Sequence, residues 1–364
     1  MIVKTITCHD VYNVGAGLQA YALNTWLCEQ GYDAEIIDYK PPYLRHYSLT
    51  AVPNKKYQKP LIRELYLLAK LPRRIKALSS PKKKAFDAFK KTYLKVTDKE
   101  YQSNDALKAA TQEADAYIAG SDQIWNPLFP NGKDPSFYLD FVQNAKKISY
   151  AASFAVEKLP EELESQVRTW LSSFDAISVR EKSGLDILTS LGINGTTVCD
   201  PVFLLQKENW NQLAKKKTIG EPYLFVYDFD RSELIESMAK QIAEKKNLKI
   251  VSYFHNDYAD QCDESGPIGF LQNVSNAEVV ISNSFHATAF SLIFQRKFFT
   301  VGRKESINTR MVDLLNDMNL ADRYLNNSAD DWQKVRPIDW GQTEACIQKT
   351  IEQSKCFLKK ALED

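Results

Sequence analysis

The sequence of 364 residues lacks paired cysteines, long apolar runs and any cluster of its four histidines. The six cysteines are scattered, with no CxxC pair, which argues against a disulfide framework and against a zinc site. No apolar run approaches the length of a membrane-spanning helix. The N-terminus "MIVKTITCHDVYN" becomes polar too early for a signal peptide. These absences predict a soluble cytoplasmic protein without a metal site.

Net charge is also nearly absent, at +1, which argues against nucleic acid as a partner. This balance conceals an asymmetry. Between Arg45 and Lys95 there are fifteen Lys and Arg against two acids, so that segment carries +13 and the remainder −12. Interleaved apolar residues make it amphipathic. It is either a solvated face of helices or a surface for an anionic membrane or a lipid-diphosphate carrier, which would hold the protein peripherally at the inner face of the membrane.

What the chain does contain is a repeated alternation of strand and helix patterns. One series starts at "MIVKTITCH" and reaches "AISVR" (176–180), and a second starts at "YLFVYDF" (223–229) and reaches "KFFTVG" (297–302). Such alternation predicts an α/β fold with two Rossmann-like, doubly wound domains that face a cleft. We predict domains at 1–205, including a basic helical excursion at about 41–112, and at 206–364, with the boundary near 206–221. The amphipathic last helix (343–363) can pack back across the first domain.

The stretch "ISNSFHATAFSLIF" (281–294) places His286 between a buried strand and a buried helix. Ser282, Asn283 and Ser284 are available to cap that helix. The positive end of the helix dipole disfavours an imidazolium, whereas the backbone N–H groups there bind anions. A histidine whose protonation follows anion binding is a candidate general acid or base. The alternative is a histidine that only caps the helix or bonds within the core.

Three arginines are candidates for binding an anion. Arg180 follows the strand "AISV", where a guanidinium can grip a phosphate or carboxylate with two hydrogen bonds. The alternative for Arg180 is a surface salt bridge with Glu181. Arg303 and Arg310 ("VGRKESINTR") follow a later strand, on the same side as His286. One of them would complete an anion clamp, and the other would be solvated.

Two polar loops also follow strands. In "HDVYNVGAGLQAYAL", Gly15 and Gly17 allow close approach of the backbone to a ligand, and Asn13 or Gln19 could hydrogen-bond it. A local turn role is the alternative for neighbouring His9 and Asp10.

The second loop, "AGSDQIWNP" (119–127), combines Ser121, Asp122 and Gln123 with the flat ring of Trp125. Sugar-binding sites favour this mixture, because hydroxyls bond to carboxylate and amide groups while the sugar face covers an aromatic ring. The alternative is an Asx turn beside a buried Trp125.

Together, seven motifs resemble the polysaccharide pyruvyl transferase family, in the expected order from residue 13 to about 315: "NVGAGLQAYAL", "GSDQIWNP", "SYAASF", "SVREKSG", "CDPVFLL", "AEVVISNSFHATAFSLIF" and "NTRMVDLL". "GSDQIW" and "SNSFHATAFSLIF" are the most specific. The sequence departs from the family pattern at Ala287, where glycine is usual, and at Ser284, where many members carry an arginine. The second departure removes an anion-binding side chain, for which Arg303 or Arg310 would compensate.

The resemblance implies a glycosyltransferase-B-like fold and a role in cell-surface polysaccharide biosynthesis. It implies transfer of pyruvate from phosphoenolpyruvate onto two hydroxyls of a saccharide, free or lipid-linked, as a ketal with release of phosphate. No cofactor is implied, because phosphate departure drives the reaction. The roles that it implies are as follows: Arg180 with Arg303 or Arg310, together with Asn283 and Ser284, would hold the donor; His286 would act as general acid or base; Asn13, Asp122 and Gln123 would orient donor or acceptor.

Two other functions are compatible with the same architecture. One is a glycosyltransferase that uses a nucleotide-sugar, and the other is a non-catalytic module of a polysaccharide-assembly complex that docks through its basic helices.

Overall fold

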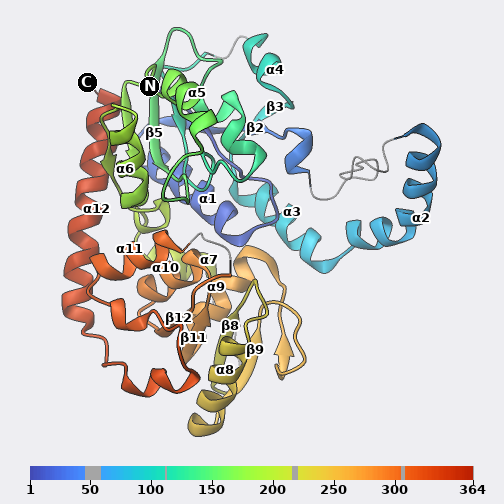
Figure 1. Ribbon diagram of the computed structural model, residues 1–364, viewed down its shortest axis with the longest axis vertical. Helices are drawn as coiled ribbons and strands as arrows, with labels where there is room; N and C mark the ends of the chain where they lie inside the picture. The colour runs from blue at the N-terminus through green and yellow to red at the C-terminus, as the bar shows by residue number, and fades with distance from the viewer. Residues whose placement is uncertain (46–58, 111–112, 215–219, 305–307, 364) are drawn as a thin grey trace.

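The computed structural model describes residues 1–45, 59–110, 113–214, 220–304 and 308–363. Two parallel sheets, one above the other in Figure 1, organise the chain. The first sheet has seven strands in the order β3-β2-β1-β4-β5-β6-β7, and the second has five in the order β10-β9-β8-β11-β12. The order reverses between β1 and β4 and between β8 and β11, which is the signature of doubly wound sheets. The predicted α/β fold with two such sheets is confirmed.

The strands are short and apolar, as expected where helices cover both faces of a sheet. Every residue of β8 and of β11 is buried. The strands of the first sheet are β1 (Ile2–Ile6), β2 (Asp33–Tyr39), β3 (Val96–Tyr101), β4 (Ala116–Ala119), β5 (Lys146–Ala152), β6 (Ala176–Val179) and β7 (Thr196–Thr197). Those of the second are β8 (Tyr223–Tyr227), β9 (Lys249–Ser252), β10 (Gln261–Cys262), β11 (Val279–Ser282) and β12 (Lys297–Thr300).

Many helices begin where the sequence supplies a cap. The side chains of Asn13, Ser80 and Ser232 each accept a hydrogen bond from a backbone N–H of the first turn of α1, α3 and α8. The helices are α1 (Val14–Glu29), α2 (Pro60–Leu78), α3 (Pro81–Tyr93), α4 (Asn104–Lys108), α5 (Glu161–Leu171), α6 (Lys182–Ser190), α7 (Lys207–Ala214), α8 (Glu233–Lys246), α9 (Gly266–Asn276), α10 (Phe285–Ile293), α11 (Thr309–Asp317) and α12 (Trp340–Glu363).

The two sheets share one continuous apolar core that extends through the helices between them. Trp210 of α7 lies at this junction: its ring is edge-on to Phe290 of α10 at 4.8 Å and to Tyr21 of α1 at 5.8 Å. Helices α3 and α9 are packed closely at Gly266, where an added Cβ would lie 2.8 Å from the Cβ of Ala85. The relative placement of the two sheets is therefore built into the core.

The last helix, α12, returns to the first sheet (Figure 1). The Ser354 hydroxyl accepts a hydrogen bond from the N–H of Cys199 at 2.9 Å, and the carbonyl of Leu362 accepts one from Lys146 Nζ, also at 2.9 Å. Ile351 and Leu358 are buried on the same helix. The end of the chain thus completes the packing of the domain with which the chain begins.

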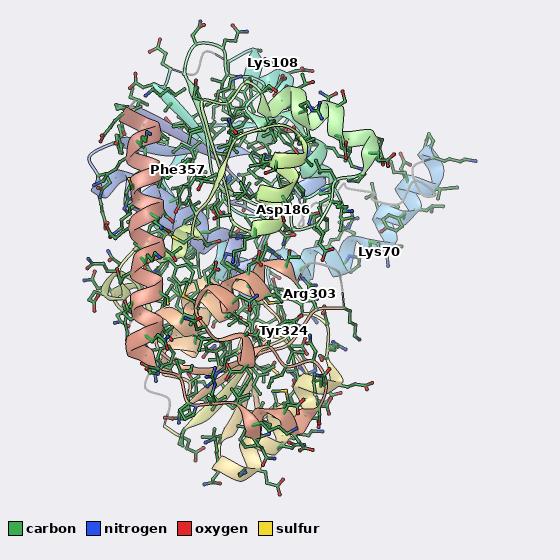
Figure 2. The ribbon with its side chains drawn as sticks, turned by 60° about the vertical axis from the view of Figure 1, so that its left-hand side comes forward. Lys70, Lys108, Asp186, Arg303, Tyr324 and Phe357 are labelled. Carbon is green, nitrogen blue, oxygen red and sulfur yellow. The ribbon has the colours of Figure 1, made fainter. Side chains whose placement is uncertain are left out.

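The basic excursion is less uniform than expected. Within the predicted helical excursion at about 41–112, residues 96–101 form a strand, β3, which pairs in parallel with β2 at the edge of the first sheet. Helix α3 packs on the body through buried Phe86 and Phe89. Among the described helices of the excursion, α2 projects away from the body in both views (Figures 1 and 2). The part of the basic segment at 46–58 lies outside the described residues.

The division of the chain at 206–221 stays a prediction, and residues 215–219 within it lie outside the described residues. Helix α7 occupies the first half of this range. Among the described helices, none combines the length and the apolarity that crossing a membrane requires.

Candidate active site

The carboxyl ends of strands from both sheets meet at one small cavity. In open α/β sheets ligands bind where the strand order reverses, and here the loops after β1 and β4 face those after β8 and β11. The cavity has a volume of ≈ 100 Å³. It is lined by Asn13, Asp122, Gln123, Phe229, Asn283, Ser284, Phe285, His286, Arg303, Arg310 and Met311.

His286 lies in the first turn of α10 and is buried where the loops of the two sheets meet. Its Nε2 atom is 3.5 Å from Oδ2 of Asp200. Within the described part of the chain Nε2 has no hydrogen-bond partner. The imidazole therefore has a carboxylate beside it and a nitrogen available to a ligand.

Gly15, in the first turn of α1, forms the other wall around the imidazole. A Cβ at this position would lie 2.0 Å from Nδ1 and 2.4 Å from Cγ of His286. No side chain larger than hydrogen fits while the ring keeps its place. We expected Gly15 to let the backbone approach a ligand, but the group that it admits is His286 itself.

Asp200 lies within ion-pair distance of both Arg180 and His286. Its Oδ1 accepts a hydrogen bond from Val202 N–H at 3.1 Å, and its Oδ2 accepts one from Arg180 Nη1 at 2.5 Å. Burial alone would raise the pKa of Asp200, but the positive charges of His286 and Arg180, with the hydrogen bond from Arg180, lower this pKa well below its usual range. Asp200 therefore stays ionised beside Arg180.

Arg180 follows β6 and is buried, so the alternative of a surface salt bridge with Glu181 is wrong. Its Nη2 is 3.6 Å from Oδ1 of Asp122. Burial acts to lower the pKa of Arg180, but the carboxylates of Asp200, Asp122 and Glu181 raise it. Among the described residues, nothing accepts a hydrogen bond from Arg180 Nε or Nη2. Glu181 instead accepts from Ser153 Oγ and Ala155 N–H.

Arg310, in the first turns of α11, lies on the same aromatic ring as Arg180. The Phe285 centroid is 4.6 Å from Cζ of Arg180 and 5.8 Å from Cζ of Arg310. With the Gln123 amide oxygen turned toward it, Arg310 donates from Nη2 at 2.9 Å and Nη1 at 3.3 Å. Burial, then the charge of Arg180, lowers the pKa of Arg310 to about 10. Its Nε is buried without an acceptor in the described structure.

Arg303 lines the cavity from the other side. Its Nη2 is 3.2 Å from Oδ1 of Asp230, and its Cζ is 5.0 Å from the centroid of Phe229. Arg303 therefore already has a carboxylate and an aromatic ring as neighbours, whereas Arg310 has no carboxylate within ion-pair distance in the described part of the chain.

The N-terminus of α10 carries no side-chain cap, although Ser284 occupies the N-cap position. Ser284 N–H donates to Ser282 Oγ at 2.9 Å. The Asn283 amide is used by the protein, since Nδ2 donates to Asp228 Oδ1 and Oδ1 accepts from Phe229 N–H. Asn283 therefore shapes this end of the cavity, and the Ser284 hydroxyl and the first N–H groups of α10 remain for an anion.

Asn13, Asp122 and Gln123 all reach the cavity, as the positions of their loops predict. Asn13 is exposed and uses Oδ1 to cap α1 through Ala16 N–H at 3.2 Å. Asp122 has a left-handed backbone with φ of 72°. These residues come from the first domain, and the α10 residues come from the second.

Three other expected ligand contacts are wrong, because the side chains have no exposed surface. Trp125 is stacked on Tyr138 at 5.5 Å, and its Nε1 donates to the carbonyl of Phe137. Gln19 donates to Thr7 Oγ1 and accepts from Ser121 N–H. The Ser121 hydroxyl donates to the carbonyl of Ala151. These three side chains pack beneath the loop that follows β4 and are not accessible to a ligand.

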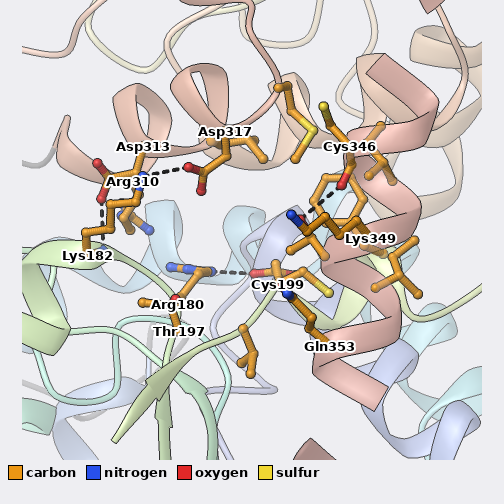
Figure 3. Close-up of a pocket in the computed structure, with 18 of the residues that line it drawn as sticks. Arg180, Lys182, Thr197, Cys199, Arg310, Asp313, Asp317, Cys346, Lys349 and Gln353 are labelled. Atoms are coloured by element: carbon orange, nitrogen blue, oxygen red, sulfur yellow. Dashed lines mark hydrogen bonds and ion pairs between the residues drawn. The ribbon is translucent and has the colours of Figure 1, made fainter. Parts of the chain in front are cut away.

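A second cavity of ≈ 370 Å³ lies on the other side of Arg310 and Phe285 (Figure 3). Arg180 and Asp200 also line it, and α11 and α12 enclose it. Lys182 at its edge pairs with Asp317 at 2.6 Å. Arg310 and Phe285 therefore form a wall shared by the two cavities, whereas Arg180 lines only the second one.

Sequence reasoning missed Asp200, Phe285 and Phe229 as site residues. Asp200 was visible only within the motif "CDPVFLL", and its Asp-Pro pair is a typical cap of a short helix, here η5 (Pro201–Phe203). Phe285 and Phe229 looked like ordinary core residues. Among the described residues, no three His, Cys, Asp or Glu side chains are grouped so that they could hold a metal ion.

Comparison with known proteins agrees with this arrangement. Residues 13–305 match the family model of polysaccharide pyruvyl transferase. No curated protein matches the sequence.

Solved structures that resemble the chain include UDP-N-acetylglucosamine 2-epimerases. A putative enzyme of this kind from Listeria monocytogenes has a TM-score of 0.52 at 10% identity, over 96% of this chain and 90% of that one. The Neisseria meningitidis enzyme has a TM-score of 0.50 at 11% identity, over 99% and 94%. At such low identity this likeness concerns the fold, which is glycosyltransferase-B-like as expected.

Proposed function

The chain belongs to the polysaccharide pyruvyl transferase family, and from that premise we propose that it transfers the pyruvyl group of phosphoenolpyruvate to two hydroxyls of a saccharide. The product is a ketal, and phosphate is released. The supporting observation is a buried cationic wall, in which Arg180 and Arg310 share the ring of Phe285 beside His286 and the uncapped N-terminus of α10. Phosphoenolpyruvate carries two anionic groups, a phosphate and a carboxylate, which such a wall would bind.

Arg310, rather than Arg303, compensates for the arginine that many family members carry at the position of Ser284. The lowered pKa of Arg310 shows that the protein alone compensates its charge poorly, because burial and Arg180 both oppose the cation. An anion beside it would relieve this cost. Arg303 already pairs with Asp230. We therefore assign the donor to Arg180, Arg310 and the N-terminus of α10, with the Ser284 hydroxyl as an additional donor of a hydrogen bond.

In the proposed reaction His286 first donates a proton and then accepts one. The methylene carbon of phosphoenolpyruvate takes one proton from His286 and becomes the methyl group, while the central carbon acquires oxocarbenium character. One sugar hydroxyl adds to this carbon and loses its proton to His286. Phosphate departs, and the second hydroxyl adds and transfers its proton to the phosphate. One proton per turnover thus moves through His286, while Asp200 holds the ring and balances the charge of the imidazolium.

Phe229 replaces Trp125 as the aromatic surface for the acceptor. It lines the cavity, is 36% exposed, and is placed by the carboxyl end of β8. Asn13, Asp122 and Gln123 lie around the same cavity with carboxylate and amide groups suited to sugar hydroxyls. The saccharide, free or lipid-linked, would enter between these residues and Phe229.

A thermal-shift titration tests the donor. Saturating phosphoenolpyruvate at about 100 times its Kd should stabilise the protein by about 2.7 kcal/mol. Arg310→Ala should abolish most of this shift, and the matched variant Arg303→Ala should retain it. A shift with a UDP-sugar but none with phosphoenolpyruvate would instead support the nucleotide-sugar glycosyltransferase, and no shift with either would favour the non-catalytic module.

Catalysis is tested by phosphate release from phosphoenolpyruvate in the presence of a panel of methyl hexosides. His286→Ala should lower the rate by about 10²–10⁴-fold, as for other general acid-base groups. A variant with undiminished turnover would remove His286 from the mechanism.

A further inference from the structure

Helix α2 is an exposed amphipathic helix outside the catalytic body. Of the eleven large apolar side chains that are exposed in the described residues, five belong to α2: Ile62, Leu65, Leu68, Leu71 and Ile75. Leu65 and Leu68 are 66% and 65% exposed, values that no other large apolar side chain of the described chain exceeds. A stripe of this kind on a monomer requires a covering partner.

The apolar side chains share one side of the helix. They are spaced three, three, three and four residues apart, so that each lies about one turn from the next. Arg63, Lys70 and Arg74 are spaced seven and four residues apart and form a separate basic stripe. The only acid of the helix is Glu64, which lies beyond its first turn.

Lysines of the neighbouring helix α3 form ion pairs with carboxylates of the protein. Lys83 pairs with Asp87, and Lys90 pairs with both Asp10 and Asp38. Lys95, just beyond α3, pairs with Asp33. The pairs of Lys90 and Lys95 fasten the basic segment to the acidic body, whereas that of Lys83 lies within α3. The basic segment is therefore not one surface, and the part that faces outward with apolar residues beside it is α2 (Figure 2, where Lys70 is labelled).

We propose that α2 lies in the interface of an anionic lipid surface, with Leu65 and Leu68 at the centre of its buried face. Basic residues on one stripe and leucine and isoleucine on the other are the composition of helices that lie in the plane of a membrane surface. The charge identifies the lipid: the basic stripe is attracted to anionic headgroups and gains nothing from neutral ones. The apolar stripe then enters the upper acyl region.

The position of α2 connects this surface to the active site. Two residues, Ser79 and Ser80, separate α2 from α3. At the start of α3, Lys82 Nζ lies 5.2 Å from the Phe254 centroid, and Phe254 packs on Phe229 at 5.3 Å. Phe229 lines the catalytic cavity. On the proposed function, a docked α2 holds the cavity near the lipid surface, where a lipid-carried saccharide would be presented.

Vesicle flotation with the full chain tests this proposal. The wild type should float with phosphatidylcholine vesicles that contain about one third phosphatidylglycerol, but not with pure phosphatidylcholine, and high salt should weaken the binding. L65S/L68S should lower the partition coefficient by about tenfold or more. The matched control L128S/F129S, which alters two exposed apolar residues far along the chain, should float like the wild type.

Failure to float, or equal flotation of L65S/L68S and the wild type, would overturn the proposal. Sedimentation velocity without vesicles tests whether a second copy of the chain covers the apolar stripe instead. A wild-type dimer that dissociates in L65S/L68S would assign the stripe to that second copy. Turnover with a soluble acceptor should be the same in L65S/L68S and in the wild type. Loss of vesicle binding with retained turnover therefore separates this proposal from the catalytic one.

Discussion

The contact between Gly15 and His286 gives the sharpest test of the site. A Cβ at position 15 would lie 2.0 Å from His286 Nδ1, whereas ordinary contact begins at 3.4 Å. In Gly15→Ala the imidazole must therefore retreat by about 1.4 Å or the two helices must separate. A misplacement of about 1 Å can cost about 10²-fold in rate. We expect Gly15→Ala to lower kcat by about that factor, and overpacking to cost about 1–3 kcal/mol of stability.

The same helix offers a matched control. Gly17 lies half a turn away, and a Cβ there would meet Phe89 at 3.4 Å and Pro267 at 3.9 Å, both ordinary contacts. Gly17→Ala should keep the wild-type kcat and gain about 0.5–1 kcal/mol from helix propensity. The assay is phosphate release at saturating phosphoenolpyruvate and acceptor, together with thermal unfolding. Wild-type kcat in a folded Gly15→Ala protein would refute the argument that the position of the His286 ring controls turnover.

Three further predictions concern residues in or beneath the candidate active site. Asp200→Asn should be less stable than the wild type at neutral pH, and the difference in the free energy of unfolding should narrow below pH of about 4, near the unfolded pKa of an aspartate. Because the pKa of Asp200 is lowered in the folded protein, its carboxylate stabilises the fold fully above that pH, and this stabilisation is lost as the pH falls further. A difference in the free energy of unfolding that is constant with pH would contradict this prediction. Phe229→Ala should raise the KM for the acceptor and leave the thermal shift with phosphoenolpyruvate unchanged; loss of that shift would place the donor at Phe229 instead. Trp125→Phe should cost about 1 kcal/mol in urea unfolding through the lost bond to Phe137 and leave the KM for the acceptor unchanged; a raised KM would restore Trp125 as a sugar contact.

The sequence predicted the sheets well because each buried parallel strand is a short apolar run. The strand β3, "VTDKEY", escaped because an edge strand with one solvated face has little apolar signal. Helix α7 escaped because its sequence, "KENWNQLA", is mostly polar and only Trp210, Leu213 and Ala214 are buried. Local pattern therefore fails where burial depends on a few side chains.

The site was predictable to the extent that strand ends gather. His286, Arg180 and Asp122 follow parallel strands, and the carboxyl ends of such strands meet at one edge. The partners of these residues depend on contacts between segments far apart. Asp200 faces His286 across 86 positions of the sequence, and Gln19 supports Ser121 across 102. No local pattern distinguishes a supporting amide from one that faces a ligand.

The return of α12 has a consequence for how the protein is made. The strands of the first sheet leave the ribosome before the helix that supplies Ser354 to Cys199 and Leu362 to Lys146 is translated. Domains usually fold as they emerge, but here the first sheet stays incompletely packed until α12 has emerged. A fragment that stops before Trp340 should expose an apolar seam around Tyr150 and recruit chaperones. The packing that α12 provides is therefore completed only after the second sheet has been translated.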